Sequence, residues 1–287
     1  MEITSIDPEY SITVCCLDME NTVRESLLSI LNQVDNRFEI IVVDGGSVDS
    51  TTTILSELEE NYQQIRVVYL NRNPSRRLGE DRNIAVQHAK GEHILLQLDA
   101  DDCYYAGILD FVTIYEKIRD SVCEDVYLKG NNLNVSSKDL LLRYGPYRNL
   151  QRGEDRDLWR RLFEQNQLIW LEHDPVCVSI GYDPGFMQKI RNGISQKITD
   201  FQVGISLMSW IRWSLSHYSV SRVLWEVLSS IYAKVLSLPR EKYSTPNDYS
   251  SKGDLNARID AESVTLTDIE ERHCIAVDGL RHPYLFR

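Results

Sequence analysis

The 287-residue sequence has no long hydrophobic run, no excess of basic charge and no paired-cysteine motif, and each absence excludes a class of protein. A membrane-spanning helix needs about 18 consecutive apolar residues, whereas the most apolar candidate, 201–211, is far shorter. The 31 Lys and Arg are outnumbered by 43 Asp and Glu, which gives a formal charge of −12. Binding to duplex DNA requires a basic surface against the phosphates. We therefore expect a protein that neither spans a bilayer nor binds nucleic acid.

The six cysteines form no C-x-x-C pair and their spacing fits no zinc site. We therefore expect reduced, mostly buried thiols in a cytoplasmic protein. The first ten residues are acidic and polar, unlike a secretion signal. Only nine of the basic residues are lysine. Together with the surplus of carboxylates, this composition suits a salt-rich cytosol, where screening weakens self-repulsion.

Strand and helix patterns alternate over the first hundred residues. The predicted strands are apolar runs at 12–16, 38–44, 66–70 and 93–98, and the predicted helices between them lie at 22–31, 49–62 and 79–90. Thr22 and Glu25 are spaced as a capping box at the start of the first helix. Repeated β–α units predict an α/β protein with a doubly wound, mostly parallel sheet covered by helices on both faces. Such a sheet binds ligands at the carboxyl ends of its strands.

We divide the chain into three regions on these patterns. They are an α/β domain at 1–185 with halves 1–102 and 103–185, an amphipathic helical extension at 186–240, and a polar, weakly ordered tail at 241–287. The extension is predicted to form helices at 198–215 and 220–238. These helices either lie on a membrane surface or pack against the α/β domain or a second subunit.

Two nucleotide-binding motifs are missing. No G-x-G-x-x-G follows the first strand, which weighs against a dehydrogenase-type dinucleotide fold, and no G-x-x-x-x-G-K-[ST] is present, which excludes a P-loop. Instead, Asp99, Asp101 and Asp102 come directly after an apolar strand. Carboxylates at a strand end suit Mg²⁺ or Mn²⁺, which take one or two of them together with phosphate oxygens and water. A polar turn with helix-capping aspartates is the alternative interpretation.

Three further positions carry groups suited to binding or catalysis. Asp44 ends a buried strand and precedes Gly45 and Gly46, so its carboxylate is placed to accept hydrogen bonds from a base or ribose, or simply to form a turn. Arg82 has a planar guanidinium that can donate hydrogen bonds to a base or a phosphate. Alternatively, it is an exposed helix residue. Glu154 and Asp155 begin a predicted helix, where one carboxylate acts as a general base or both merely favour the helix dipole.

These segments occur in one order and with one spacing over residues 11–182, and there the sequence resembles the family-2 glycosyltransferases of the GT-A fold. The resembling segments include Phe38-Glu-Ile-Ile-Val-Val-Asp-Gly-Gly-Ser47, Leu98-Asp-Ala-Asp-Asp102 and Gly153-Glu-Asp-x-Asp-Leu-Trp159. The resemblance implies a metal-dependent, inverting transfer of a sugar from a nucleoside-diphosphate sugar to an acceptor hydroxyl or a lipid phosphate. It implies a nucleotide-sugar half at 1–102, an acceptor half at 103–185, and a place in glycan or glycolipid assembly, of the archaeal surface-glycan or protein N-glycosylation type.

The resemblance also implies roles for individual residues. Asp44 would contact the nucleobase with help from Arg82, Asp99 would contact the ribose, and Asp101 would hold Mg²⁺ or Mn²⁺ on the diphosphate. Asp155 would be the catalytic base, and Glu154 beside it would contact substrate. The sequence departs from the family at the nucleotide end in two places. Cys15-Cys-Leu-Asp18 replaces the usual Pro-x-(Tyr/Phe)-Asn, and Gly45 replaces the second Asp of Asp-Asp-Gly-Ser.

Two other functions are compatible with parts of this pattern. A sugar-1-phosphate nucleotidyltransferase also uses α/β architecture and a metal, but it should carry a Gly-rich loop with Arg or Lys after the first strand, and none occurs here. A non-catalytic nucleotide-sugar-binding module would bind donor without turnover. If the extension contacts a membrane, the protein lies at the cytoplasmic face.

Overall fold

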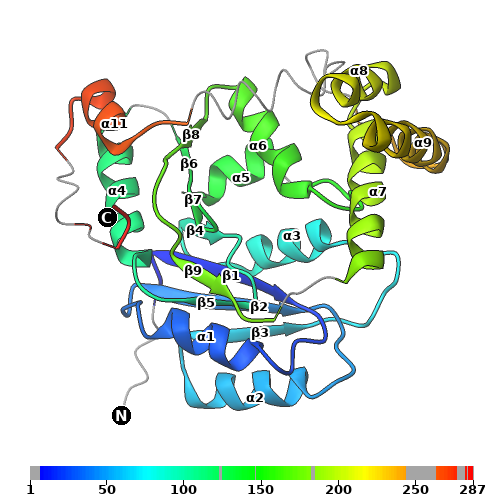
Figure 1. Cartoon of the computed structure of the whole chain (residues 1–287). Coiled ribbons are helices and arrows are strands. Elements are labelled where there is room, and N and C mark those ends of the chain that lie inside the picture. Colours follow the sequence, from blue (N-terminus) through cyan, green and yellow to red (C-terminus); the bar gives the residue numbers. More distant parts are fainter. Residues whose placement is uncertain are drawn as a thin grey trace, which may run out of the picture.

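The computed structural model of the chain describes residues 7–122, 125–145, 147–181, 185–243, 263–276, 282 and 284–286. Within them, the central sheet has the strand order β3 (Ile65–Tyr69), β2 (Phe38–Asp44), β1 (Tyr10–Cys16), β4 (His93–Leu96), β7 (Asn134–Ser137), β6 (Tyr127–Lys129) and β8 (Leu168–Trp170). A second, two-stranded sheet pairs β5 (Asp102–Tyr104) with β9 (Cys177–Ser179). Figure 1 shows helices on both sides of the central sheet.

The helices follow the strands in the predicted alternation over the first hundred residues. They are α1 (Val23–Leu31), α2 (Thr51–Asn61), α3 (Leu78–His88), α4 (Ile108–Ser121), α5 (Lys138–Tyr144), α6 (Glu154–Glu164), α7 (Phe186–Gln202), α8 (Leu207–His217), α9 (Val220–Ser237) and α11 (Leu266–His273). Strands β1 to β4 are parallel to one another, whereas β7 is antiparallel to both β4 and β6. The predicted mostly parallel α/β sheet is therefore confirmed.

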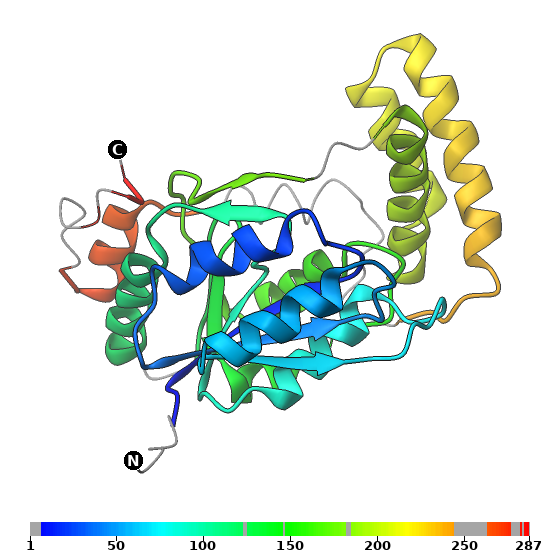
Figure 2. The same ribbon diagram turned by 90° about the horizontal axis from the view of Figure 1, so that it is seen from below.

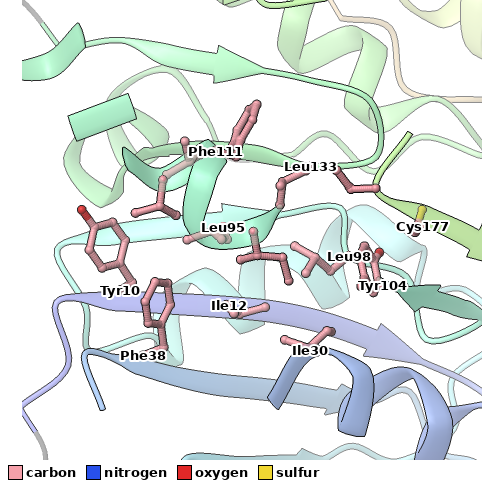
Figure 3. Close-up of a cluster of buried hydrophobic side chains, with 14 of the residues drawn as sticks. Tyr10, Ile12, Ile30, Phe38, Leu95, Leu98, Tyr104, Phe111, Leu133 and Cys177 are labelled. Carbon is pink, nitrogen blue, oxygen red and sulfur yellow. The ribbon is translucent and has the colours of Figure 1, made fainter. Parts of the chain in front are cut away.

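Alternate residues of β2 face two separate hydrophobic layers, because side chains in a strand point to opposite sides. Ile40 and Val42 pack with α1, α2 and α4 on one face, and Ile41 and Val43 pack with α3, α5 and α6 on the other. Figure 3 shows part of the first layer, where Tyr10 and Phe38 lie at one end of the cluster. Both faces of the sheet are thereby buried. This is expected for parallel strands whose sequences are near-continuous apolar runs.

The extension differs from the prediction in its helix boundaries. The predicted helix at 198–215 is two helices, α7 and α8, which are separated at Gly204. Gly204 has a φ of +100°, a conformation that interrupts an α-helix and that glycine adopts at little cost. Helix α9 packs against both α7 and α8, with Phe201, Trp210 and Ala233 in their shared apolar cluster. Figure 2 shows these three helices as a group at the edge of the α/β domain.

One local expectation is wrong. Thr22 does occupy the position before α1, but its side chain accepts no capping hydrogen bond, so the predicted capping box is absent. The weakly ordered tail stays a prediction, because the structure describes only part of it; within that part, apolar residues pack on the main core. Val264, Leu266, Ile269 and Leu285 are all buried there. Apolar residues spaced along an otherwise polar segment were sufficient to attach it. Residues 244–262 and 277–281 lie outside the described residues.

The described cysteines are all free thiols, and Cys123 lies outside the described residues. Cys16 and Cys177 are buried, Cys15 and Cys103 are partly buried, and Cys274 is exposed. No helix in the described ranges combines the length and the hydrophobicity that crossing a membrane requires.

Candidate active site

Asp44 ends β2 at the carboxyl edge of the sheet, where Cys16 of β1 and Tyr69 of β3 are level with it. Its side chain is buried, with only 1% of the residue exposed. The carboxylate accepts hydrogen bonds from the Ser47 backbone N–H at 3.1 and 3.3 Å and from the Ser47 hydroxyl. Asp44 therefore closes the turn after β2 through its hydrogen bonds with Ser47.

The turn after β2 is joined to the loop after β1 and to a basic segment after β3. Arg72 donates two hydrogen bonds to the Asp18 carboxylate, at 2.8 and 3.1 Å. Gly46 has a φ of +96°, and a Cβ atom there would lie 2.3 Å from the backbone nitrogen of Arg72. Only glycine fits this position, because the conformation and the space both exclude a side chain.

A second connection lies beside the first. Arg76 forms an ion pair with Asp81 at 2.6 Å, and it donates to the carbonyl oxygen of Gly45, also at 2.6 Å. Burial raises the pKa of Asp81, although Arg76 opposes that rise. Two ion pairs, Arg72 with Asp18 and Arg76 with Asp81, therefore lie around the end of β2.

Arg82 lies on α3 and is buried, contrary to the exposed-helix interpretation. Its guanidinium is 3.6 Å from the Asp99 carboxylate and 3.6 Å from the Glu154 carboxylate, and it lies 5.7 Å from the centre of the Tyr147 ring. Burial lowers the pKa of Arg82, but Tyr147, Glu154 and Asp99 outweigh it and keep the pKa above its usual value. The guanidinium thus stays charged and holds two acidic residues together.

Asp99 follows β4 and presents its carboxylate to solvent, since 54% of its side chain is exposed. The protein packed around the carboxylate still desolvates it enough to raise its pKa to about 6; Arg82 opposes this, while Asp102 and Asp101 add to it. Its backbone is fixed, because the N–H donates to the Tyr104 hydroxyl at 2.9 Å. Asp99 is therefore an accessible carboxylate whose negative charge is poorly compensated by the protein.

The two aspartates after Asp99 have different surroundings. Asp101 is half-buried, and its carbonyl oxygen accepts a hydrogen bond from the Ile180 N–H at 2.8 Å. Asp102 is buried within β5 and accepts a hydrogen bond from the Cys177 thiol at 3.5 Å. Asp102 thus joins β5 to β9, and Asp101 is left with its carboxylate beside Asp99.

Glu154 and Asp155 occupy the first turn of α6, which begins after Gly153 in a left-handed conformation with φ of +75°. Glu154 is 5% exposed, and burial raises its pKa although Arg82 opposes the rise. Asp155 is half-buried, and the hydrogen bond described for its carboxylate comes from the Arg156 N–H at 2.7 Å. Of the two carboxylates, Glu154 is committed to Arg82 and Asp155 is the one available to a substrate.

The structure therefore brings five of the six predicted site residues into one electrostatic cluster. The negative charges of Asp101 and Asp155 both raise the pKa of Asp99, and Arg82 contacts Asp99 and Glu154. Asp44 lies on the far side of β1 from this cluster, because β1 separates β2 from β4. Two strand spacings are about 10 Å, so the two groups occupy one edge of the sheet. Arg82 pairs with Asp99 and Glu154, and Asp44 is not among its partners in the described residues.

A family model described as "Glycosyl transferase family 2" matches residues 11–178, more than half of the chain. The chain belongs to glycosyl transferase family 2. It is 27% identical over 190 residues to a protein named putative glycosyltransferase EpsE from Bacillus subtilis, an alignment that covers 55% of this chain and 68% of EpsE. Two further relatives are matched over only 38% and 15% of their own lengths. The chain is therefore an enzyme of the glycosyltransferase class.

Two solved structures confirm the GT-A fold of this glycosyltransferase. Staphylococcus aureus TarS 1–349, in complex with UDP-GlcNAc, superposes with a TM-score of 0.54 at 16% identity, covering 78% of this chain and 72% of that one. The mannosyltransferase PcManGT from Pyrobaculum calidifontis, in complex with GDP-Man and Mn²⁺, gives 0.54 at 14% identity over 88% and 79% of the two chains. At this identity the similarity concerns the fold.

The carboxylates of this family-2 enzyme fit a divalent cation only in part. The described residues contain no group of three or more His, Cys, Asp or Glu side chains arranged to hold a metal. Asp99 and Asp101 nevertheless supply hard oxygen donors, and the charge of Asp101 is close enough to disfavour the charge of Asp99. A cation would relieve this repulsion. Two carboxylates, with diphosphate oxygens and water in the remaining positions, suit Mg²⁺ or Mn²⁺.

Sequence reasoning missed Arg72, Arg76 and Asp81, which surround the turn after β2. The basic segment 72–77 directly after a strand was the available signal. One departure from the family pattern is explained by the same contacts, because Asp18 binds Arg72 through its carboxylate. His173 is structural, since its Nε2 accepts the Asn131 N–H at 2.9 Å and its Nδ1 lies 2.6 Å from a carbonyl oxygen.

Proposed function

We propose that this enzyme transfers a glycosyl group, with inversion, from a nucleoside-diphosphate sugar to an acceptor hydroxyl or a lipid phosphate. The observation that supports this most is the position of Asp155, an uncommitted carboxylate beside the ion cluster of Arg82, Asp99 and Glu154. UDP-GlcNAc in TarS and GDP-Man in PcManGT support a nucleotide-sugar donor. Because these two donors differ in nucleobase and sugar, we leave both identities to experiment.

The mechanism assigns each residue one task. Asp44 and the turn after β2 contact the nucleobase, Asp99 contacts the ribose, and Arg82 and Glu154 hold Asp99 and the substrate in position. When the acceptor is a hydroxyl, its oxygen forms a bond to C1 of the sugar, its proton passes to Asp155, and the C1–O bond to the diphosphate breaks with both electrons on the nucleotide. A lipid phosphate is already ionised, so Asp155 would then orient it instead.

We propose Mg²⁺ or Mn²⁺ as the cofactor, held by Asp101 with Asp99 beside it. Bound there, the ion would neutralise negative charge on the departing diphosphate. We also propose that the reaction belongs to glycan or glycolipid assembly, of the archaeal surface-glycan or protein N-glycosylation type, at the cytoplasmic face of a membrane. The acidic, lysine-poor composition supports the salt-rich setting.

The donor test uses a panel of UDP-, GDP- and dTDP-sugars with Mn²⁺ or Mg²⁺. One of these donors should raise the melting temperature, because a ligand stabilises the fold by RT ln(1 + [L]/Kd), and should release nucleoside diphosphate when acceptor is added. Asp101→Ala should lose the metal-dependent part of this stabilisation, whereas Asp120→Ala, whose side chain is 71% exposed on α4, should retain it. Donor binding without release would identify a non-catalytic module, and an unchanged Mn²⁺ titration in Asp101→Ala would remove the metal assignment.

Helix α9 supports contact with a membrane surface. Large apolar side chains are exposed along its whole length, namely Val220, Leu224, Trp225, Leu228, Ile231, Tyr232, Val235 and Leu238. Residues 186–243 contain eight Lys and Arg but three Asp and Glu, a formal charge of +5, so the rest of the chain carries −17. An apolar face within a basic segment is the combination that binds anionic bilayers. We therefore propose that α9 lies on an anionic leaflet.

Flotation with phosphatidylglycerol vesicles tests this contact. The wild type should float, and Leu228→Glu/Val235→Glu should not, because two carboxylates would be placed in the apolar face of α9. Leu142→Glu is the matched control, since Leu142 is equally exposed (56%) but lies on α5. If the double variant floats like the wild type, the contact lies elsewhere. If the wild type is instead a dimer that the double variant dissociates, α9 is a self-association surface and the membrane proposal is wrong.

A further inference from the structure

A cavity of about 340 Å³ lies between α7, α8 and α9. It is outside residues 11–178, the part of the chain that the family model matches, so the family's own site does not account for it. Its lining includes Gly193, Gln196, Lys197, Trp210, Arg222 and Trp225. A volume of roughly 300–1,000 Å³ is typical of pockets that bind small molecules. The cavity is thus large enough to hold the head of a ligand.

The charge of the lining favours an anion. Lys189, Lys197 and Arg222 face one acidic residue, Glu226. Lys197 is buried, and its Nζ donates to Glu226 at 2.7 Å and to the Ser229 hydroxyl at 2.6 Å. Arg222 lies at the surface, with 61% of its side chain exposed and its Nε 3.7 Å from Glu226. Glu226 is thus shared by Lys197 and Arg222, and the three basic residues leave the lining with a net formal charge of +2, which favours an anionic group.

Gly193 gives the cavity its space. It lies in the middle of α7, where glycine is less stable than alanine, yet a Cβ atom there would meet nothing within 4 Å. Neither backbone conformation nor packing against a neighbour requires glycine at this position. The absence of a side chain at Gly193 leaves this part of the cavity open to a ligand.

One side of the cavity adjoins the residue that precedes α6. Gln196, one of its lining residues, contacts the residue that precedes α6, since a Cβ atom on Gly153 would be 3.1 Å from the Gln196 amide. The backbone N–H of Arg152 donates to the Thr199 hydroxyl of α7 at 3.3 Å. Glu154 and Asp155 follow immediately in the chain. The lining residue Gln196 therefore lies beside the residue that begins the turn before Glu154 and Asp155.

The cavity is also continuous with the apolar face of α9. Trp225 lines the cavity and belongs to that face, with 49% of the residue exposed. Leu224 and Leu228 lie one residue before it and three residues after it on the same helix. A hydrocarbon chain leaving the cavity past Trp225 would thus find apolar surface along α9.

We infer that this cavity binds the phosphate head of a polyprenyl-type acceptor lipid, with the hydrocarbon chain along α9. The inference rests on the proposed glycosyl transfer and names its acceptor class. Arg222 and Lys189 bind the phosphate, Trp210 and Trp225 contact the first part of the chain, and Gln196 faces the catalytic turn.

The test measures binding of geranylgeranyl phosphate by isothermal titration calorimetry and by tryptophan fluorescence. The wild type should bind it saturably, with geranylgeraniol and inorganic phosphate each at least about tenfold weaker, because each lacks one half of the recognised chemistry. Gly193→Phe should weaken binding by at least about tenfold because the ring fills the cavity, whereas the matched Gly193→Ala should change it little. Arg222→Gln should weaken it about tenfold through loss of a charge-assisted hydrogen bond.

Thermal unfolding followed by circular dichroism shows whether Gly193→Phe is folded, and stabilisation by the donor with Mn²⁺ reports the nucleotide site separately. If the donor binds but geranylgeranyl phosphate does not, or binds equally to wild type and Gly193→Phe, the acceptor inference is wrong and the proposed function stands. Equal affinity for inorganic phosphate would make the cavity a free-phosphate site, and binding only to phosphatidylglycerol vesicles would make the extension a bilayer contact; either result overturns the inference. If no donor binds, the proposed function itself fails.

Discussion

Asp155→Asn is expected to reduce transfer to a hydroxyl acceptor by about 10²–10⁴-fold, the range that a positioned general base contributes. Asparagine keeps the size of the side chain and an oxygen to accept the Arg156 N–H, but it cannot take a proton. Donor binding should therefore be retained while turnover is lost. The measurement is the rate of nucleoside-diphosphate release with acceptor present, alongside the donor-induced shift in melting temperature.

The control for this variant is Asp139→Asn. Asp139 is also an acidic residue in the first turn of a helix, α5, and it is exposed, so it controls for loss of a favourable helix-dipole interaction. It should leave the rate unchanged. If Asp155→Asn retains most of its rate with a hydroxyl acceptor, Asp155 is not the base. Retention with a phosphate acceptor alone would instead identify the phosphate as the natural nucleophile.

Arg82→Met is expected to destabilise the fold by about 3–5 kcal/mol, because it leaves a buried acid without its partner. Glu154 would keep a carboxylate whose side chain is only 6% exposed, with no cation at 3.6 Å. Glu154→Gln in the same chain removes that unpaired charge, so the double variant should regain most of the lost stability. Equilibrium unfolding in guanidinium chloride measures both changes.

Arg143→Met is the matched control for the arginine. Arg143 also forms an ion pair, with Asp125 at 3.8 Å, but its side chain is 60% exposed. Exposed pairs contribute about 0–1 kcal/mol, so this variant should differ little from the wild type. If Arg143→Met lowered the stability as much as Arg82→Met does, the effect would come from removing any ion-paired arginine. In that case the buried cluster at α3 and α6 would not be the cause.

Local patterns predicted the α/β domain well because they depend on neighbours in the chain. The apolar run at 38–44 became β2 with its predicted bounds, since a strand buried on both faces favours a near-continuous apolar run. The run at 93–98 became β4 but ended at Leu96, because Gln97 adopts a φ of +65° and turns the chain. The helix predicted at 198–215 was interrupted at Gly204, where the periodic pattern gave no sign of a break.

The candidate site was predicted as a set of positions but not as a set of contacts. Asp44, Asp99 and Asp155 were found because each follows or begins a regular element, where polar side chains reach the edge of the sheet. The contact between Arg82 and Glu154 was not predictable in this way. Glu154 is 72 residues further along the chain, and α3 meets α6 only because both cover the same face of the sheet.

Chain order alone specified the β–α alternation, the parallel strands and the acidic residues at their ends, because hydrogen bonding and side-chain periodicity act over a few residues. Folding decided which charges meet, how α7, α8 and α9 leave a cavity at Gly193, and where the described tail packs through Leu285. These features depend on contacts between segments that are far apart in the chain. The shapes and charges of the packed segments determine these contacts, so they cannot be predicted from a local sequence pattern.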